Sequence, residues 1–146
     1  NSAAKTIDRI IDVFPTGDKE MIRAMLASSL QGVVAQTLLR KVGGGRVGAF
    51  EILVGTNAVR NLIRENQIPQ MFSMMQTGSR YGMITMQDSI SDLLDAGIID
   101  KDEARRALVE VSEESESEDA DYASAAVGGG KIDQGGSEEP DGGYTF

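Results

Sequence analysis

Two arginines one helical turn apart are the residues of this 146-residue chain best spaced to form an interaction surface. Arg60 and Arg64 lie in a segment whose apolar residues share one helical face, namely Val59, Leu62 and Ile63. The two cations therefore stand on the polar side of a predicted helix, where they can be presented to a partner. The simpler interpretation is ordinary solvated charge, partly neutralised by Glu65.

The composition excludes several kinds of chemistry. The chain has no cysteine, so it can form neither a disulfide nor a cysteine-ligated metal site. It also has no histidine, the side chain that most often serves as an acid–base group or metal ligand near neutral pH. A carboxylate-only magnesium site is left open, but no paired carboxylates and no nucleophile with a partner base stand out. We therefore predict no catalytic residue and no metal ligand in this chain.

Two glycine runs imitate a phosphate-binding loop. Such a loop needs Gly-x-x-x-x-Gly-Lys-Ser/Thr between a strand and a helix, so that backbone N–H groups and a lysine converge on the phosphates. Gly43–Arg46 has neither the lysine nor the helix, and Gly128–Lys131 lacks both the spacing and a preceding strand. We therefore predict no nucleotide-binding residue in this chain.

The segment before the arginines has the alternating pattern of two β-strands joined as a hairpin. Side chains alternate between two faces from Val33 to Val42 and again from Arg46 to Val54, and three consecutive glycines separate the two runs. Glu51 is the one acid in the middle of a predicted strand. We expect it to form an ion pair with Arg40 or Arg46 across the hairpin, and a role in positioning a neighbouring subunit or the catalytic core is the alternative.

Helical periodicity surrounds the hairpin. Before it, a helix capped by Asn1 or Ser2 is expected to end at Pro15, and Thr16–Asp18 forms a turn and cap into a second helix. The second helix carries an apolar stripe made of Met21, Ile22, Met25, Leu26 and Leu30. After Thr56 the foldable chain is expected to be entirely helical, with a C-terminal glycine ending one helix at Gly97 and Asp100 capping the last.

A stripe of methionines in this helical region has two interpretations. Met71, Met74 and Met75 could line an adaptable binding groove, because methionine repacks easily. More often such a stripe belongs to the core, and that is the interpretation we favour.

The charge is distributed unevenly along the chain. The formal net charge is −9, yet residues 1–111 hold 13 acids and 13 bases, whereas residues 112–146 hold ten acids and Lys131 as the one base. We predict one folded region over 1–111 and a disordered acidic tail over 112–146, which either solubilises the protein or docks through Tyr144 and Phe146. The balanced charge of the folded region predicts no nucleic-acid partner.

Several stretches of the chain resemble the PilT-type twitching-motility ATPases. Ala58–Glu65 resembles the AIRNLIRE signature of that family, with Val59 where isoleucine is usual, and Gln76–Asp88 resembles the stretch that follows. The hairpin is similar to the family's own, although Phe50 stands where histidine is frequent. Ser2–Pro15 is similar to the helix that follows the family's histidine box, which would place that histidine just upstream of this chain.

The resemblance covers about residues 1–108 and implies a fold and a function. The implied fold class is α/β (α+β within this chain): the C-terminal part of a RecA-like P-loop ATPase domain, a β-hairpin followed by a helical bundle, and then the disordered tail. The implied function is that of a homo-hexameric motor that uses ATP and magnesium to retract type IV pili, with the inner-membrane platform protein of the pilus as its partner. The family's nucleotide motifs would lie upstream, so we expect this chain alone to be inactive.

In that family the signature is associated with retraction rather than with nucleotide contacts. The resemblance carries this role to the six matching positions, Ala58, Arg60, Asn61, Leu62, Arg64 and Glu65. Many related secretion ATPases carry a four-cysteine metal insert, so the absence of cysteine favours the retraction branch. A PilU-type paralogue stays open, because the tail departs from the family pattern.

Two other functions are compatible with this sequence. The chain alone would also suit a non-enzymatic helical interaction module with an acidic tail, or a related type II or type IV secretion-system ATPase. No apolar run approaches the roughly 20 residues that cross a bilayer, and no signal segment is recognisable at the start. We expect a cytoplasmic protein at the inner face of the cytoplasmic membrane, with only indirect membrane contact.

Overall fold

The structure, a computed structural model, describes residues 2–112. The predicted tail therefore lies outside the described residues, except for Ser112. The elements follow in the order α1 (Ala3–Asp12), α2 (Lys19–Ser29), β1 (Gly32–Arg40), β2 (Arg46–Val54), α3 (Asn57–Arg64), α4 (Met71–Gln76) and α5 (Met86–Asp95). Short 3-10 turns cover Thr16–Asp18, Ile68–Gln70 and Ser79–Tyr81, and residues 101–112 form a further helix.

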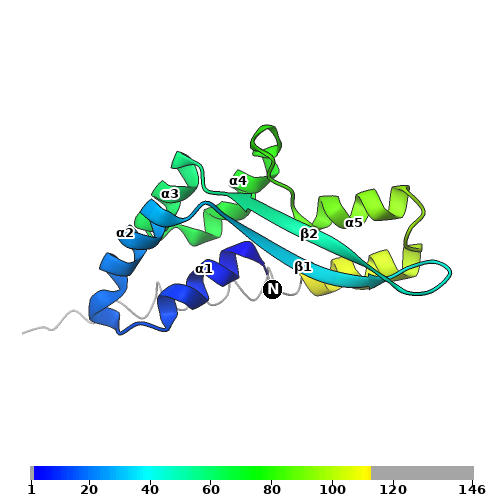
Figure 1. The fold of residues 1–146 in the computed structure, drawn as a ribbon, viewed down its shortest axis with the longest axis horizontal. Coiled ribbons are helices and arrows are strands. Elements are labelled where there is room, and N and C mark those ends of the chain that lie inside the picture. Colours follow the sequence, from blue (N-terminus) through cyan, green and yellow to red (C-terminus); the bar gives the residue numbers. More distant parts are fainter. Residues whose placement is uncertain (1, 113–146) are drawn as a thin grey trace, which may run out of the picture.

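The predicted hairpin is confirmed and runs through the middle of the described fold (Figure 1). β1 and β2 pair antiparallel from Gly32 opposite Val54 to Arg40 opposite Arg46. All three residues of Gly43–Gly45 have positive φ values, a conformation that glycine adopts without steric cost. The alternation seen in the sequence directs one side of each strand inward, where Ala35, Leu39, Ala49, Glu51 and Leu53 are buried.

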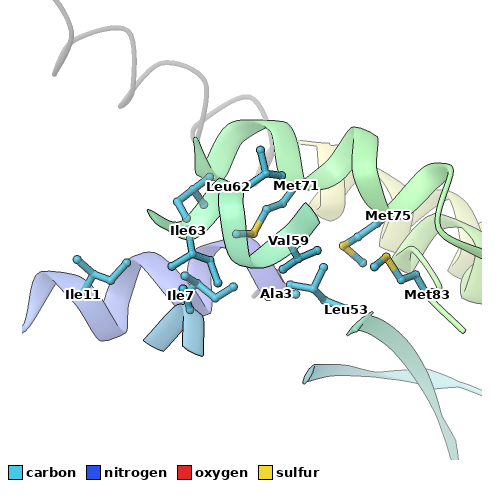
Figure 2. Packing of buried hydrophobic residues seen from close by; sticks show 12 residues of the cluster. Ala3, Ile7, Ile11, Leu53, Val59, Leu62, Ile63, Met71, Met75 and Met83 are labelled. Carbon is cyan, nitrogen blue, oxygen red and sulfur yellow. The ribbon is translucent and has the colours of Figure 1, made fainter. Parts of the chain in front are cut away.

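Apolar side chains form two separate clusters along the hairpin. One lies at its root, where Leu53 of β2 packs with residues of α1, α3 and α4 (Figure 2). The other lies towards the glycine turn, where Leu39 and Ala49 pack with α5 and the 101–112 helix. The hairpin therefore joins two groups of helices, which Figure 1 shows at its two ends.

The two helices before the hairpin follow the predictions only in part. Ser2 caps α1 by accepting a 3.1 Å hydrogen bond from the Lys5 N–H, as expected. In α2 the predicted apolar stripe is half exposed: Met21 and Met25 are 57% and 59% exposed, while Ala27 is fully buried. The reason is that α2 meets α3 through its small residue, and no described segment covers the side that carries the two methionines.

The segment after Thr56 is not entirely helical, so that expectation is wrong at one point. Ile84 forms an antiparallel bridge with Ile52 of β2, through backbone hydrogen bonds of 2.8 and 3.0 Å. The outer edge of β2 has backbone groups that need partners, and the segment between α4 and α5 supplies them. The predicted end of α5 and the predicted start of the 101–112 helix are confirmed. Gly97 has φ +68° just after α5, and Asp100 accepts the Glu103 N–H at 2.8 Å.

The methionine stripe belongs to the core, as favoured from the sequence. Met71 is fully buried, Met75 is nearly so, and Met74 is partly buried against the same cluster. Figure 2 shows Met71 beside the α3 side chains, and Met75 facing Met83. These methionines therefore fix α4 against α3.

Candidate functional site

The six signature residues lie on α3 and at its end. Thr56 begins the helix by accepting the Val59 N–H at 3.3 Å, and Asn66, with φ +55°, ends it in the left-handed region. Val59 and Ile63 are fully buried, and Leu62 is 9% exposed. Of the six signature residues, Leu62 is thus a core residue that holds α3 in place.

Four signature residues form the outer face of α3: Ala58, Asn61, Arg64 and Glu65 are exposed. The Arg64 guanidinium donates a hydrogen bond to the Asn61 side-chain oxygen. Within residues 2–112 Glu65 forms no ion pair with either arginine, so the partial neutralisation considered in the simpler interpretation does not occur. The Arg64 guanidinium binds Asn61, one turn earlier, instead of Glu65. The face therefore presents the Arg64 cation, the Asn61 amide and the Glu65 carboxyl together.

Arg60 does not share this face, although the sequence predicted it there. Its guanidinium turns towards α2 and donates from Nε to the Gly55 carbonyl at 2.9 Å. One terminal nitrogen donates to the carbonyls of Ser28 at 2.8 Å and of Ala27 at 3.3 Å. The prediction of two arginines presented together is therefore wrong: Arg64 is presented and Arg60 is engaged internally.

A cavity of about 310 Å³ adjoins the beginning of α3. It brings together the two motifs recognised in the sequence, because its lining comes from the start of the signature helix and from the stretch after α4. Thr77, Arg80 and Tyr81 give it polar and aromatic walls, and the Arg80 guanidinium lies 4.7 Å from the centre of the Tyr81 ring. The exposed face of α3 and this cavity together are the candidate interaction surface.

The second motif has mainly a structural role. A Cβ added to Gly78 would lie 2.3 Å from the Met83 sulfur and 2.9 Å from the Met74 carbonyl oxygen, so only glycine fits. Thr85 caps α5 by accepting the Asp88 N–H at 3.1 Å, and its hydroxyl donates to the Asp88 carboxylate at 2.6 Å. These contacts fix the segment that forms one wall of the cavity.

Glu51 does not form the expected ion pair across the hairpin. The strand register places it opposite Ala35, and Arg40 pairs instead with Glu103 at 3.1 Å. The buried Glu51 carboxyl accepts the backbone N–H of Ala3 at 2.6 Å, at the N-terminus of α1. It therefore ties β2 to α1.

Glu103 is an ionised residue whose importance the sequence did not reveal. Its carboxylate is 4% exposed and accepts hydrogen bonds from Arg106, and from the backbone N–H and Nε of Arg40. The hydrogen bond from Arg106, followed by that from the Arg40 backbone, lowers the pKa of Glu103 to about 2. The pattern Asp100-x-x-Glu103 at the start of a helix is a capping-box signal that could have drawn attention to it.

Among the described residues no group of acids could hold a metal ion, and no helix is long and apolar enough to cross a membrane. Gly43–Gly45 forms the exposed turn of the hairpin, where no helix follows to receive a phosphate. The other glycine run, Gly128–Lys131, lies outside the described residues.

The fold is that of the RecA-like ATPases. It matches the structure of the Legionella pneumophila ATPase DotB with a TM-score of 0.63, over 75% of this chain and 30% of that one; at 20% identity this match shows the fold alone. It matches the crystal structure of the pilus retraction motor PilT with bound ADP with a TM-score of 0.65 and 43% identity, over 73% of this chain and 29% of that one. The predicted fold class is confirmed.

Curated relatives specify the family within this class. The chain is 54% identical over 104 residues to the type IV pilus retraction ATPase PilT of Pseudomonas aeruginosa, and 54% identical over 105 residues to a twitching motility protein of Neisseria gonorrhoeae. Each match covers 71% of this chain, and 30% and 28% of the relatives. No family model matches the chain. Over the matched residues the chain is homologous to the PilT-type ATPases, which confirms the family recognised in the sequence.

Two alternatives considered from the sequence are not favoured by these matches. The type IV pilus ATPase PilU of Pseudomonas aeruginosa is 27% identical over 139 residues, half the identity to PilT. A non-enzymatic interaction module is disfavoured because curated relatives named ATPases match most of the described chain. The chain spans less than a third of the length of the PilT-type relatives that it matches.

Proposed function

We propose that this chain is the part of a type IV pilus retraction ATPase that presents the α3 surface to a partner during retraction. The observation that carries the proposal is the 54% identity to PilT, combined with the exposure of four signature residues on one helix face. The full-length protein would hydrolyse ATP with magnesium, and this chain would contribute no residue to that reaction.

The finer points of the proposal come from the family resemblance. We propose a homo-hexamer that works at the inner face of the cytoplasmic membrane, with the pilus platform protein as its partner. The solved PilT structure is a retraction motor with ADP bound, which supports a nucleotide-driven role for the parent protein. We propose that the nucleotide site lies in the remainder of the parent protein, where the family resemblance places the nucleotide motifs.

The role proposed for the α3 face is contact rather than catalysis. Arg64 supplies a cation fixed by Asn61, and Ala58 leaves room beside the cavity for a partner's side chain. A pre-oriented guanidinium binds a partner's carboxylate at a lower entropic cost than a freely moving one.

Replacement of Arg64 by alanine in the full-length protein tests this function. Twitching motility should be lost while ATP hydrolysis by the purified protein falls less than about twofold, because the side chain is exposed and lies on a face without nucleotide-binding elements. Arg105→Ala is a matched control, since Arg105 is also an exposed helical arginine, 76% exposed, in the 101–112 helix. Normal motility with Arg64→Ala, or loss of hydrolysis as complete as that caused by removing the phosphate-binding lysine, would contradict the proposal.

A further inference from the structure

We infer that Arg60 is a positioning residue, which acts in retraction by fixing the orientation of α3 and not by touching the partner. This inference rests on the proposed function of the α3 face. It separates two arginines that share one signature and one row of the same helix: Arg64 presents its charge to the outside, and Arg60 uses its charge internally.

Arg60 binds the C-terminal end of α2. The last carbonyls of an α-helix lack partners within the helix and carry the negative end of its dipole. In α2 the Leu26 carbonyl accepts a hydrogen bond from the Leu30 N–H. The carbonyls of Ala27 and Ser28 accept hydrogen bonds from the Arg60 guanidinium. A side chain of α3 therefore completes the end of another helix, about 30 residues earlier in the chain.

The same guanidinium also holds the point where the chain leaves the hairpin. Its Nε donates to the Gly55 carbonyl, and the Gly55 N–H donates to the Gln31 carbonyl at 2.8 Å. The link between α2 and β1 passes close to the link between β2 and α3. A Cβ added to Gly55 would lie 2.4 Å from the Leu30 carbonyl oxygen. Arg60 thus joins three segments at one point: the end of α2, the exit of β2 and the first turns of α3.

This arrangement determines the direction of the exposed α3 face. The buried side of α3 is apolar, and apolar contacts are not directional. The hydrogen bonds of Arg60 are directional and bind three backbone carbonyls, so they fix the rotation of α3 relative to the hairpin. Loss of these bonds should leave the fold intact but let Asn61 and Arg64 move from the position in which a partner finds them.

The test compares Arg60→Ala, Arg60→Lys and Arg64→Ala in the full-length protein. Hydrogen exchange should become roughly tenfold faster in Arg60→Ala at the amides of Leu30 and Gly55, which flank the junction, because charge-assisted hydrogen bonds are lost. Arg64→Ala should leave these amides unchanged. Arg60→Lys keeps a cation at the end of α2, so it should recover part of the protection and, in parallel, part of the motility that Arg60→Ala loses at equal protein level.

The outcomes separate this inference from the proposed function. If Arg60→Ala abolishes motility without changing exchange at Leu30 and Gly55, Arg60 touches the partner directly and the inference is wrong. If motility of Arg60→Ala returns once its cellular level is matched to wild type, Arg60 serves only stability, and the inference also fails. If hydrogen exchange changes as expected but cells with Arg64→Ala show normal twitching motility, the proposed function of the α3 face fails. The hydrogen bonds of Arg60 to the three carbonyls then stand as a structural result.

Discussion

The carboxyl of Glu51, in the middle of β2, accepts a 2.6 Å hydrogen bond from the backbone N–H of Ala3 at the first turn of α1. Ala3 is fully buried and Glu51 nearly so, which removes water as an alternative partner for either group. The bond spans 48 positions of the sequence and connects the helix to the strand that carries Leu53. This polar contact thus helps to fix the root of the hairpin, in addition to the apolar cluster.

Replacement of Glu51 by alanine should destabilise this end of the fold by about 1–3 kcal/mol, the cost of leaving a buried donor without an acceptor. Glu51→Gln should cost less, because an amide oxygen can still accept the Ala3 N–H. The thermal unfolding midpoint of the full-length protein measures both effects. Glu20→Gln, at an exposed position of α2, is the control and should change stability by less than about 0.5 kcal/mol.

The sequence predicted the elements better than it predicted the polar contacts between them. The alternation from Arg46 to Val54 matches β2 at both ends, since a strand with one buried face must show it. The partners of Arg60 and Glu51 were missed because they are backbone groups, which carry no residue identity. Spacing along α3 placed Arg60 on the polar side correctly, but only the packing of α2 beside it decides whether that side meets water.

The stability of the far end of the hairpin should depend on acid pH through Glu103. Its pKa is lowered from 4.5 to about 2, so the ionised carboxylate stabilises the folded state above pH 4.5. That contribution should be lost progressively as the pH falls from about 4.5 to 2. The free energy of unfolding, measured across this pH interval, should decline in the wild-type protein. In Glu103→Gln it should decline less.

The acid titration has an internal control. Glu110 also contacts Arg106, through a 2.8 Å hydrogen bond, but it is 57% exposed. Glu110→Gln should therefore leave the decline between pH 4.5 and 2 in place. An identical decline in wild type and Glu103→Gln would show that another group causes it.

Titration of this chain with magnesium-bound ATP should give no binding heat at micromolar concentrations. The described residues hold neither a phosphate-binding loop nor a group of acids for the metal. The full-length protein is the positive control, and far-UV circular dichroism of the chain verifies that it is folded during the experiment. A micromolar dissociation constant for the folded chain would reveal a nucleotide site that its residues do not indicate.

Replacement of Gly78 by alanine should destabilise the connection between α4 and α5. The added methyl group would lie 2.9 Å from the Met74 carbonyl oxygen, a backbone atom that cannot move aside as easily as the Met83 side chain can. Overpacking of this kind costs about 1–3 kcal/mol. Thermal unfolding measures the cost, and Gly17→Ala is the control, because no atom lies within 4 Å of its added Cβ. If Gly78→Ala is as stable as the control, the close contact with the Met74 carbonyl does not require glycine at this position.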